Sequence, residues 1–193
     1  MPSSMLHLIV AKKVEPNGSI DWYIGNIAAD AIRDRKQKDE AHFENHPNIE
    51  AALKEFAQKA DNDYLKGILL HLYTDWKWKT TYLVDFINKT EGRWYPQYAE
   101  EIGKLTAYAF HNTEWAQKLW EQMEQCDEFG FRETTFIMEK EGVKEMIRAQ
   151  KRWQTENKTG PSEAFPPTLI ETFANKTAAE FILWCNEIFE SRN

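Results

Sequence analysis

The stretch Gly67–Lys79, GILLHLYTDWKWK, decides the fold prediction because most of its residues are apolar and recur with a helical period. Large apolar side chains each contribute about 1.5–3 kcal/mol when they leave water, so this helix should lie in the core. His71 and Asp75 nevertheless lie within it, four residues apart. Because a buried carboxylate is destabilising unless another group compensates its charge, the stretch also predicts a partner for Asp75.

The rest of the chain shows the same 3.6-residue period, and no segment alternates convincingly as a β-strand does. The 193 residues are 42% hydrophobic and 13% aromatic, which suits one compact domain with a sizeable core. We therefore predict an all-α fold in which residues 1–193 form a single helical domain of about seven helices.

Capping residues and prolines suggest where these helices begin. Ser3 or Ser4 is expected to cap the first helix, and Pro47 to be the first residue of the third. The helices after the first are expected at 20–34, 47–60, 63–88, 96–125, 139–154 and 168–190. The charged run 33–46, the segment 128–135 and the proline-rich connector 159–167 are expected to be loops.

Charge and cysteine content limit the possible functions. The 31 acidic and 24 basic residues give a formal charge of −7, which repels phosphate backbones and provides no nucleic-acid footprint. Cys126 and Cys185 have no partner pattern, so neither a disulfide framework nor a thiolate metal site is predicted. The sequence predicts no signal peptide and no membrane segment, so we expect a cytoplasmic protein. The sequence is compatible with a homo-oligomer.

His71 and Asp75 have the spacing of a pair of metal ligands. Residues four apart on a helix face the same side, with β-carbons roughly 5–6 Å apart, so both side chains can reach one ion. The alternative is a simple hydrogen bond between them. Asp30 is the one charged residue in the small-residue segment 23–32. We expect it to bind a metal ion; the alternatives are that it caps a helix or pairs with a nearby arginine.

Two further histidines extend this pair to a larger donor set. His7 lies on the apolar face of the first expected helix, and His42 lies at the end of the charged run. The candidate metal ligands are therefore three imidazoles and two carboxylates: His7, Asp30, His42, His71 and Asp75. This set suits zinc, with manganese or iron as alternatives. Water on such an ion has its pKa lowered to about 7, so hydroxide becomes available at neutral pH.

The segments MLH (5–7), YIGNIAADAI (23–32), KDEAHF (38–43) and LLHLYTDWKWK (69–79), in this order, resemble the zinc-dependent phospholipase C family. The likeness is strongest to its small bacterial members that lack a secretion signal, and it ends near residue 90. It implies an all-helical fold and a cluster of metal ions that hydrolyses phosphodiesters. Single-strand-specific nucleases with a related fold use a similar cluster.

The resemblance also implies a role for each ligand. One zinc would be shared by Asp30, His42, His71 and Asp75. Asp75 would bridge to a second ion held by His7, and Asp30 would be a candidate general base. One or two ions are therefore expected.

The secreted enzymes of that family have a further histidine and an HxxxE helix after the HxxxD motif. Here no histidine follows Asp75 until His111, with Glu114 three residues later. These two residues are candidates for a second metal site because i and i+3 share a helix face. The alternative is a surface ion pair or a histidine that packs between helices.

The leading functional hypothesis is a metal-dependent hydrolase of a phosphodiester or phosphomonoester that uses metal-bound hydroxide on a small-molecule or other phosphoester substrate. The alternative is a non-catalytic helical protein with a structural or sensing metal site. Phosphohydrolases with an adjacent His-Asp pair are disfavoured because the chain contains no such pair.

Overall fold

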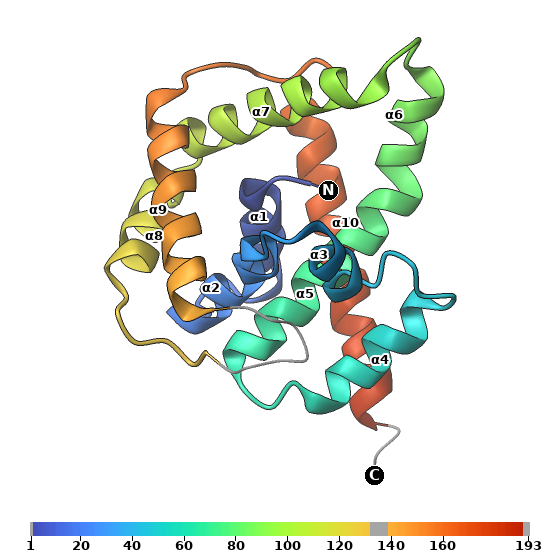
Figure 1. Cartoon of the computed structure of the whole chain (residues 1–193), viewed down its shortest axis with the longest axis vertical. Coiled ribbons are helices and arrows are strands. Elements are labelled where there is room, and N and C mark those ends of the chain that lie inside the picture. The colour runs from blue at the N-terminus through green and yellow to red at the C-terminus, as the bar shows by residue number, and fades with distance from the viewer. Residues whose placement is uncertain (1, 132–138, 191–193) are drawn as a thin grey trace.

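The computed structural model describes residues 2–131 and 139–190 (Figure 1). All regular structure in these residues is helical, and they contain no β-strand, which confirms the all-α prediction. Of the expected loop at 128–135, residues 128–131 are irregular and 132–135 lie outside the described residues.

The first helix begins at one of its two predicted caps. Helix α1 (Ser4–Val14) begins after Ser3, whose hydroxyl accepts a hydrogen bond from the Leu6 N–H. Helix α2 (Ile20–Ala28) passes into the short 3₁₀ turn η1 (Ala29–Ala31), so the helix expected to reach residue 34 ends earlier.

The charged run does not form the expected loop, because Arg35–Ala41 is helix α3. The Asp34 side chain caps α3 by accepting a hydrogen bond from the Gln37 N–H. Arg35 pairs with Asp39 four residues later, and Lys36 pairs with Glu40 in the same way. Such pairs stabilise a helix and account for its formation in a polar segment.

Helix α4 (Ile49–Lys59) begins later than predicted. Pro47 is not its first residue, because the Asn48 side chain is the N-cap and accepts a hydrogen bond from the Ala51 N–H.

The predicted helix at 63–88 is present as one continuous rod. It consists of α5 (Asp63–Trp78), the π-helical segment η2 (Lys79–Leu83) and α6 (Val84–Lys89). The C-terminal half contains α7 (Trp94–Asn112), α8 (Ala116–Gln125), α9 (Lys140–Glu156) and α10 (Pro167–Glu190).

The single helix expected at 96–125 is therefore two helices, α7 and α8. With α3 added and α5–α6 counted as one rod, the described residues form nine helices rather than about seven. None of the helices in this part of the chain is long and apolar enough to cross a membrane.

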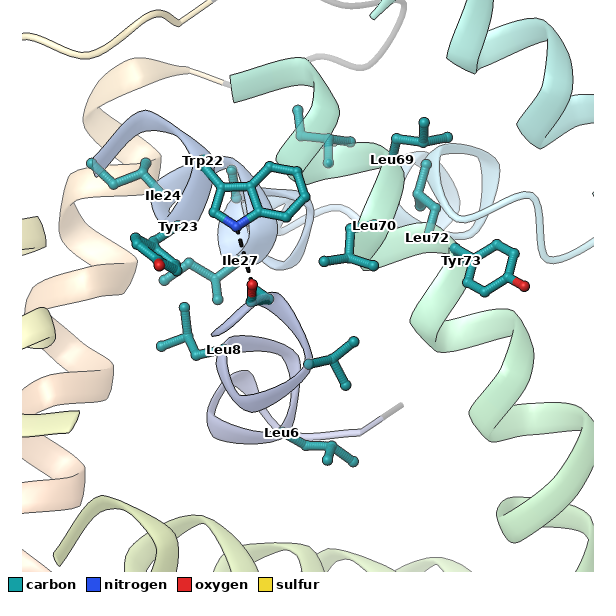
Figure 2. Packing of buried hydrophobic residues seen from close by; sticks show 14 of the residues in the cluster. Leu6, Leu8, Trp22, Tyr23, Ile24, Ile27, Leu69, Leu70, Leu72 and Tyr73 are labelled. Carbon is teal, nitrogen blue, oxygen red and sulfur yellow. Dashed lines mark hydrogen bonds between the residues drawn. The ribbon is translucent and has the colours of Figure 1, made fainter. Parts of the chain in front are cut away.

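Helix α1 lies at the centre of the molecule and contacts α2, α5, α7 and α10 (Figure 1). Its backbone is linked to α2 by a hydrogen bond from the Trp22 indole N–H to the Ala11 carbonyl, and apolar side chains of α1, α2 and α5 fill the space around it (Figure 2). Figure 2 labels the main members of this core: Leu6, Leu8, Trp22, Tyr23, Ile24, Ile27, Leu69, Leu70, Leu72 and Tyr73.

Two glycines allow α2 and α5 to touch through their backbones. A β-carbon on Gly25 would lie 2.0 Å from the Tyr64 carbonyl oxygen, and one on Gly67 would lie 2.3 Å from the Trp22 carbonyl oxygen. Neither contact has room for a side chain. This close crossing brings the end of α2 beside His71, one turn further along α5.

Candidate metal centre

The five candidate ligands converge where α1, η1, α3 and α5 meet. His7 comes from α1, Asp30 from η1, His42 from the C-terminal end of α3, and His71 and Asp75 from α5. They form two overlapping groups in which all the potential ligand atoms lie within 4.8 Å of one another. One group is His7, His71 and Asp75, and the other is Asp30, His42 and His71. His71 belongs to both.

The protons on His42 and His71 are fixed by backbone carbonyl groups. His71 Nδ1 lies 2.8 Å from the Asn26 carbonyl oxygen, and His42 Nδ1 lies 2.7 Å from the Lys38 carbonyl oxygen. A carbonyl only accepts, so in each neutral ring Nδ1 carries the hydrogen and Nε2 carries the lone pair. The two Nε2 atoms are 3.1 Å apart, so two lone pairs point toward one place.

The Asp75 carboxylate faces the same place. Its Oδ2 lies 3.6 Å from His71 Nε2 and 3.7 Å from His42 Nε2, and its Oδ1 lies 3.3 Å from His7 Nε2. Both oxygens, and both ring nitrogens of His7, are buried without a hydrogen-bond partner among the described residues. The His7 ring instead stacks on His71, with centroids 3.9 Å apart. A buried carboxylate without donors is destabilising unless a cation compensates it.

The pKa shifts in the cluster favour a neutral His71 and ionised carboxylates on Asp30 and Asp75. Burial and the neighbouring His7 lower the pKa of His71 to about 3. Burial acts to raise the pKa of Asp75, but His71 and His7 outweigh it and hold this pKa below its usual value. For Asp30, burial is outweighed by His71 and Lys38, which lower the pKa to about 2. These are the protonation states that a metal ion requires.

Asp30 marks the open side of the cluster. Its side chain is 20% exposed, whereas the side chains of His7, His42 and Asp75 are at most 2% exposed. Asp30 Oδ1 lies 3.9 Å from His42 Nε2 and 2.7 Å from Lys38 Nζ. The partner of Asp30 is therefore a lysine and not one of the arginines considered from the sequence.

The C-terminal end of α3 holds His42 in place. The Phe43 N–H donates to the Glu40 carbonyl and the Glu44 N–H to the Asp39 carbonyl, which is the double hydrogen bond of a Schellman motif. Phe43 occupies the left-handed position of this motif, with φ of 54°, where glycine is usual. A bulky residue in this conformation is strained, and such strain is concentrated at functional sites.

His111 and Glu114 do not form a second metal site. His111 Nε2 lies 2.9 Å from the Gln154 carbonyl oxygen and 3.1 Å from the Asn157 carbonyl oxygen, both at the end of α9. Glu114 is exposed in the turn after α7, and neither residue belongs to a ligand group in the described chain. His111 is thus the helix-packing histidine of the alternative interpretation.

Sequence reasoning missed Asn26 and Lys38, which support the ligands. Lys38 precedes His42 by four residues, so a helix prediction for 35–41 would have placed it on the same face. Asn26 contacts His71 through its backbone carbonyl group. Every residue type has such a group, so the sequence does not indicate this contact.

We compared the chain with protein-family models, with curated proteins and with solved structures, and none of the three comparisons gives a match. The resemblance to the zinc-dependent phospholipase C family accordingly stays a prediction that rests on the sequence motifs.

Proposed function

We propose that this protein is a metal-dependent hydrolase of phosphoric esters, related to the zinc-dependent phospholipase C family. The ion or ions would be held by His7, Asp30, His42, His71 and Asp75. The observation that supports this proposal most strongly is that three hydrogen-bond acceptors lie within 3.7 Å of one another. They are the Nε2 atoms of His42 and His71, whose ring hydrogens are on Nδ1, and Asp75 Oδ2, which has no hydrogen-bond partner among the described residues.

These residues fit a divalent cation in three respects. Histidines that bind metals usually donate their other ring N–H to a carbonyl or carboxylate, as His42 and His71 do. The two carboxylates are ionised at neutral pH. The mixture of imidazole and carboxylate ligands without thiolate suits zinc, with manganese or iron as alternatives.

A divalent ion bound there supplies Lewis acidity and a water molecule that ionises near neutral pH. The protein's own contribution is to hold the buried ligands away from solvent and to leave Asp30 at the open side, where a substrate enters. With its pKa lowered to about 2, Asp30 is better suited to hold a cation than to act as the general base that the resemblance implies.

A structural or sensing metal site is the second candidate function. It is favoured by the complete burial of His7 and His71 and the near-complete burial of Asp75, because closed sites are typical of structural ions. Hydrolysis and metal content together distinguish the two candidates.

The test compares the wild-type protein with Asp75→Asn and with Asp85→Asn. The second variant makes the same chemical change at an exposed residue of α6 that pairs with Lys89. Metal is measured by elemental analysis, and activity with 4-nitrophenyl phosphate and bis(4-nitrophenyl) phosphate. We expect Asp75→Asn to lose both metal and hydrolysis and Asp85→Asn to keep both.

Hydrolysis retained in Asp75→Asn, or no metal in the reconstituted wild type, would contradict the proposal. Stoichiometric metal with no hydrolysis of either ester would favour the structural alternative.

A further inference from the structure

A pocket of about 910 Å³ lies against the open side of the cluster. Asp30 and Lys38 form part of its wall, together with residues of η2, α7, α9 and the chain just before α1. Its volume is in the range of small-molecule binding sites. The wall of the pocket contains both charged and large apolar side chains, and each kind has a consequence for the substrate.

Three cationic side chains line the pocket, and they differ in how they are paired. Lys79 forms an ion pair with Glu44, which lies in the same wall. Arg35 is 85% exposed and pairs with Asp39 on its own helix. Lys38 is 27% exposed, and its Nζ lies 2.7 Å from Asp30 Oδ1, which makes it the cation nearest to the candidate ligands.

The pairing of Lys38 depends on the charge of the cluster. A divalent cation held by Asp30 would take up part of the negative charge that now compensates Lys38. Lys38 would then present an under-compensated ammonium group beside the ion, which favours an anion such as a phosphoryl group.

Most large apolar side chains in the wall come from α7 and α9. They include Trp94, Tyr95, Ile102, Met146 and Trp153. Tyr95 is 65% and Trp153 40% exposed, which is unusual for such large rings in a protein whose other tryptophans mostly lie in the core. Exposed aromatic rings in a pocket bind flat apolar groups by stacking and by burial of area.

We propose that this pocket binds a phosphoric ester whose organic group is aromatic, with Lys38 contacting the phosphoryl oxygens and Trp153 contacting the ring. This inference rests on the proposed function and specifies its substrate class. Lys38 lies next to the cluster and Trp153 lines the same pocket, so a phosphoryl group in contact with Lys38 would face the metal ligands.

The experiment measures binding without hydrolysis. Phenylphosphonate and methylphosphonate share one charged group, and their C–P bonds resist hydrolysis, so isothermal titration calorimetry can compare them on the zinc-loaded chain of 193 residues. We expect phenylphosphonate to bind about tenfold tighter or more, because burial of its ring removes apolar area from water.

Three variants test the two proposed contacts. Lys38→Met should weaken both ligands about tenfold or more, because each loses a charge-assisted hydrogen bond. Trp153→Leu should weaken only phenylphosphonate. Lys36→Met is the matched control, since Lys36 lies on the same helix, is 87% exposed and pairs with Glu40. It should leave both affinities unchanged.

Lys38 also pairs with Asp30, so the affinities are compared at equal metal content and Lys38→Arg is included. This variant keeps the charge and should retain much of the binding that Lys38→Met loses. The inference is overturned if the two phosphonates bind equally, if the wild type binds neither, or if Lys38→Met binds both as the wild type does. It is also overturned if Lys38→Arg loses as much affinity as Lys38→Met. The predicted binding pattern without hydrolysis of any aryl phosphate would support this inference while contradicting the proposed function.

Discussion

Removal of the metal should lower the melting temperature of this protein substantially. Without an ion, Asp75 and His7 keep buried polar atoms that no described residue satisfies, and two lone pairs face each other 3.1 Å apart. An ion that binds only the folded state at a free concentration of 1,000 times its Kd stabilises that state by about 4 kcal/mol. For a chain of 193 residues, each kcal/mol shifts the melting temperature by about 2–4 °C, so the expected change is about 8–16 °C.

The assay is differential scanning calorimetry in buffered zinc and in excess chelator, with Asp75→Asn and Asp85→Asn measured beside the wild type. Asp85→Asn should show the same metal-dependent shift as the wild type. Asp75→Asn should show little shift, and in chelator it should melt no lower than the wild type, because the amide removes a buried charge whose oxygens have no hydrogen-bond partner among the described residues. Equal melting temperatures of the wild type in zinc and in chelator would refute the reasoning, as would a full shift in Asp75→Asn.

Two further predictions concern the scaffold. Gly67→Ala should destabilise the protein by about 1–3 kcal/mol or more in chemical denaturation, because its methyl group would lie 2.3 Å from the Trp22 carbonyl oxygen. Burial acts to raise the pKa of Glu101, but hydrogen bonds from Lys104 and Ser162 outweigh it and lower this pKa to about 2. A lowered pKa contributes stability that is complete above the ordinary value of 4.5 and is lost as the pH falls toward 2. The difference in unfolding free energy between the wild type and Glu101→Gln should therefore be largest near neutral pH and shrink across that acidic window.

The 3.6-residue recurrence of apolar residues predicted most of the helices, because most of them bury one face against α1 or α5. The helix at 63–88 was located to within a residue, and His71 and Asp75 lie on the same side of it, as their spacing predicts. The break between α7 and α8 was missed, since residues 112–115 contain neither glycine nor proline. That helix ends where His111 contacts the backbone of α9, a tertiary contact that has no local signal.

Helix α3 was missed for a different reason. It has no hydrophobic face, and its end lacks the glycine that normally marks a Schellman motif, because Phe43 takes that position. The Asp34 cap and the charge pairs spaced four residues apart were visible in the sequence. Together they predict a helix only weakly when packing is unknown, since each charge pair stabilises a helix by only a few tenths of a kcal/mol.

The missed helix is the element that ties the two proposed sites together. The carbonyl group of Lys38 fixes the proton on His42, and the ammonium group of the same residue pairs with Asp30 in the pocket wall. One residue therefore orients a candidate metal ligand through its backbone and presents a cation to the pocket through its side chain. Because the backbone contact survives substitution of the side chain, Lys38→Met should leave His42 in place while it removes the cation. Binding of metal and binding of a phosphoryl group can therefore be separated at this position.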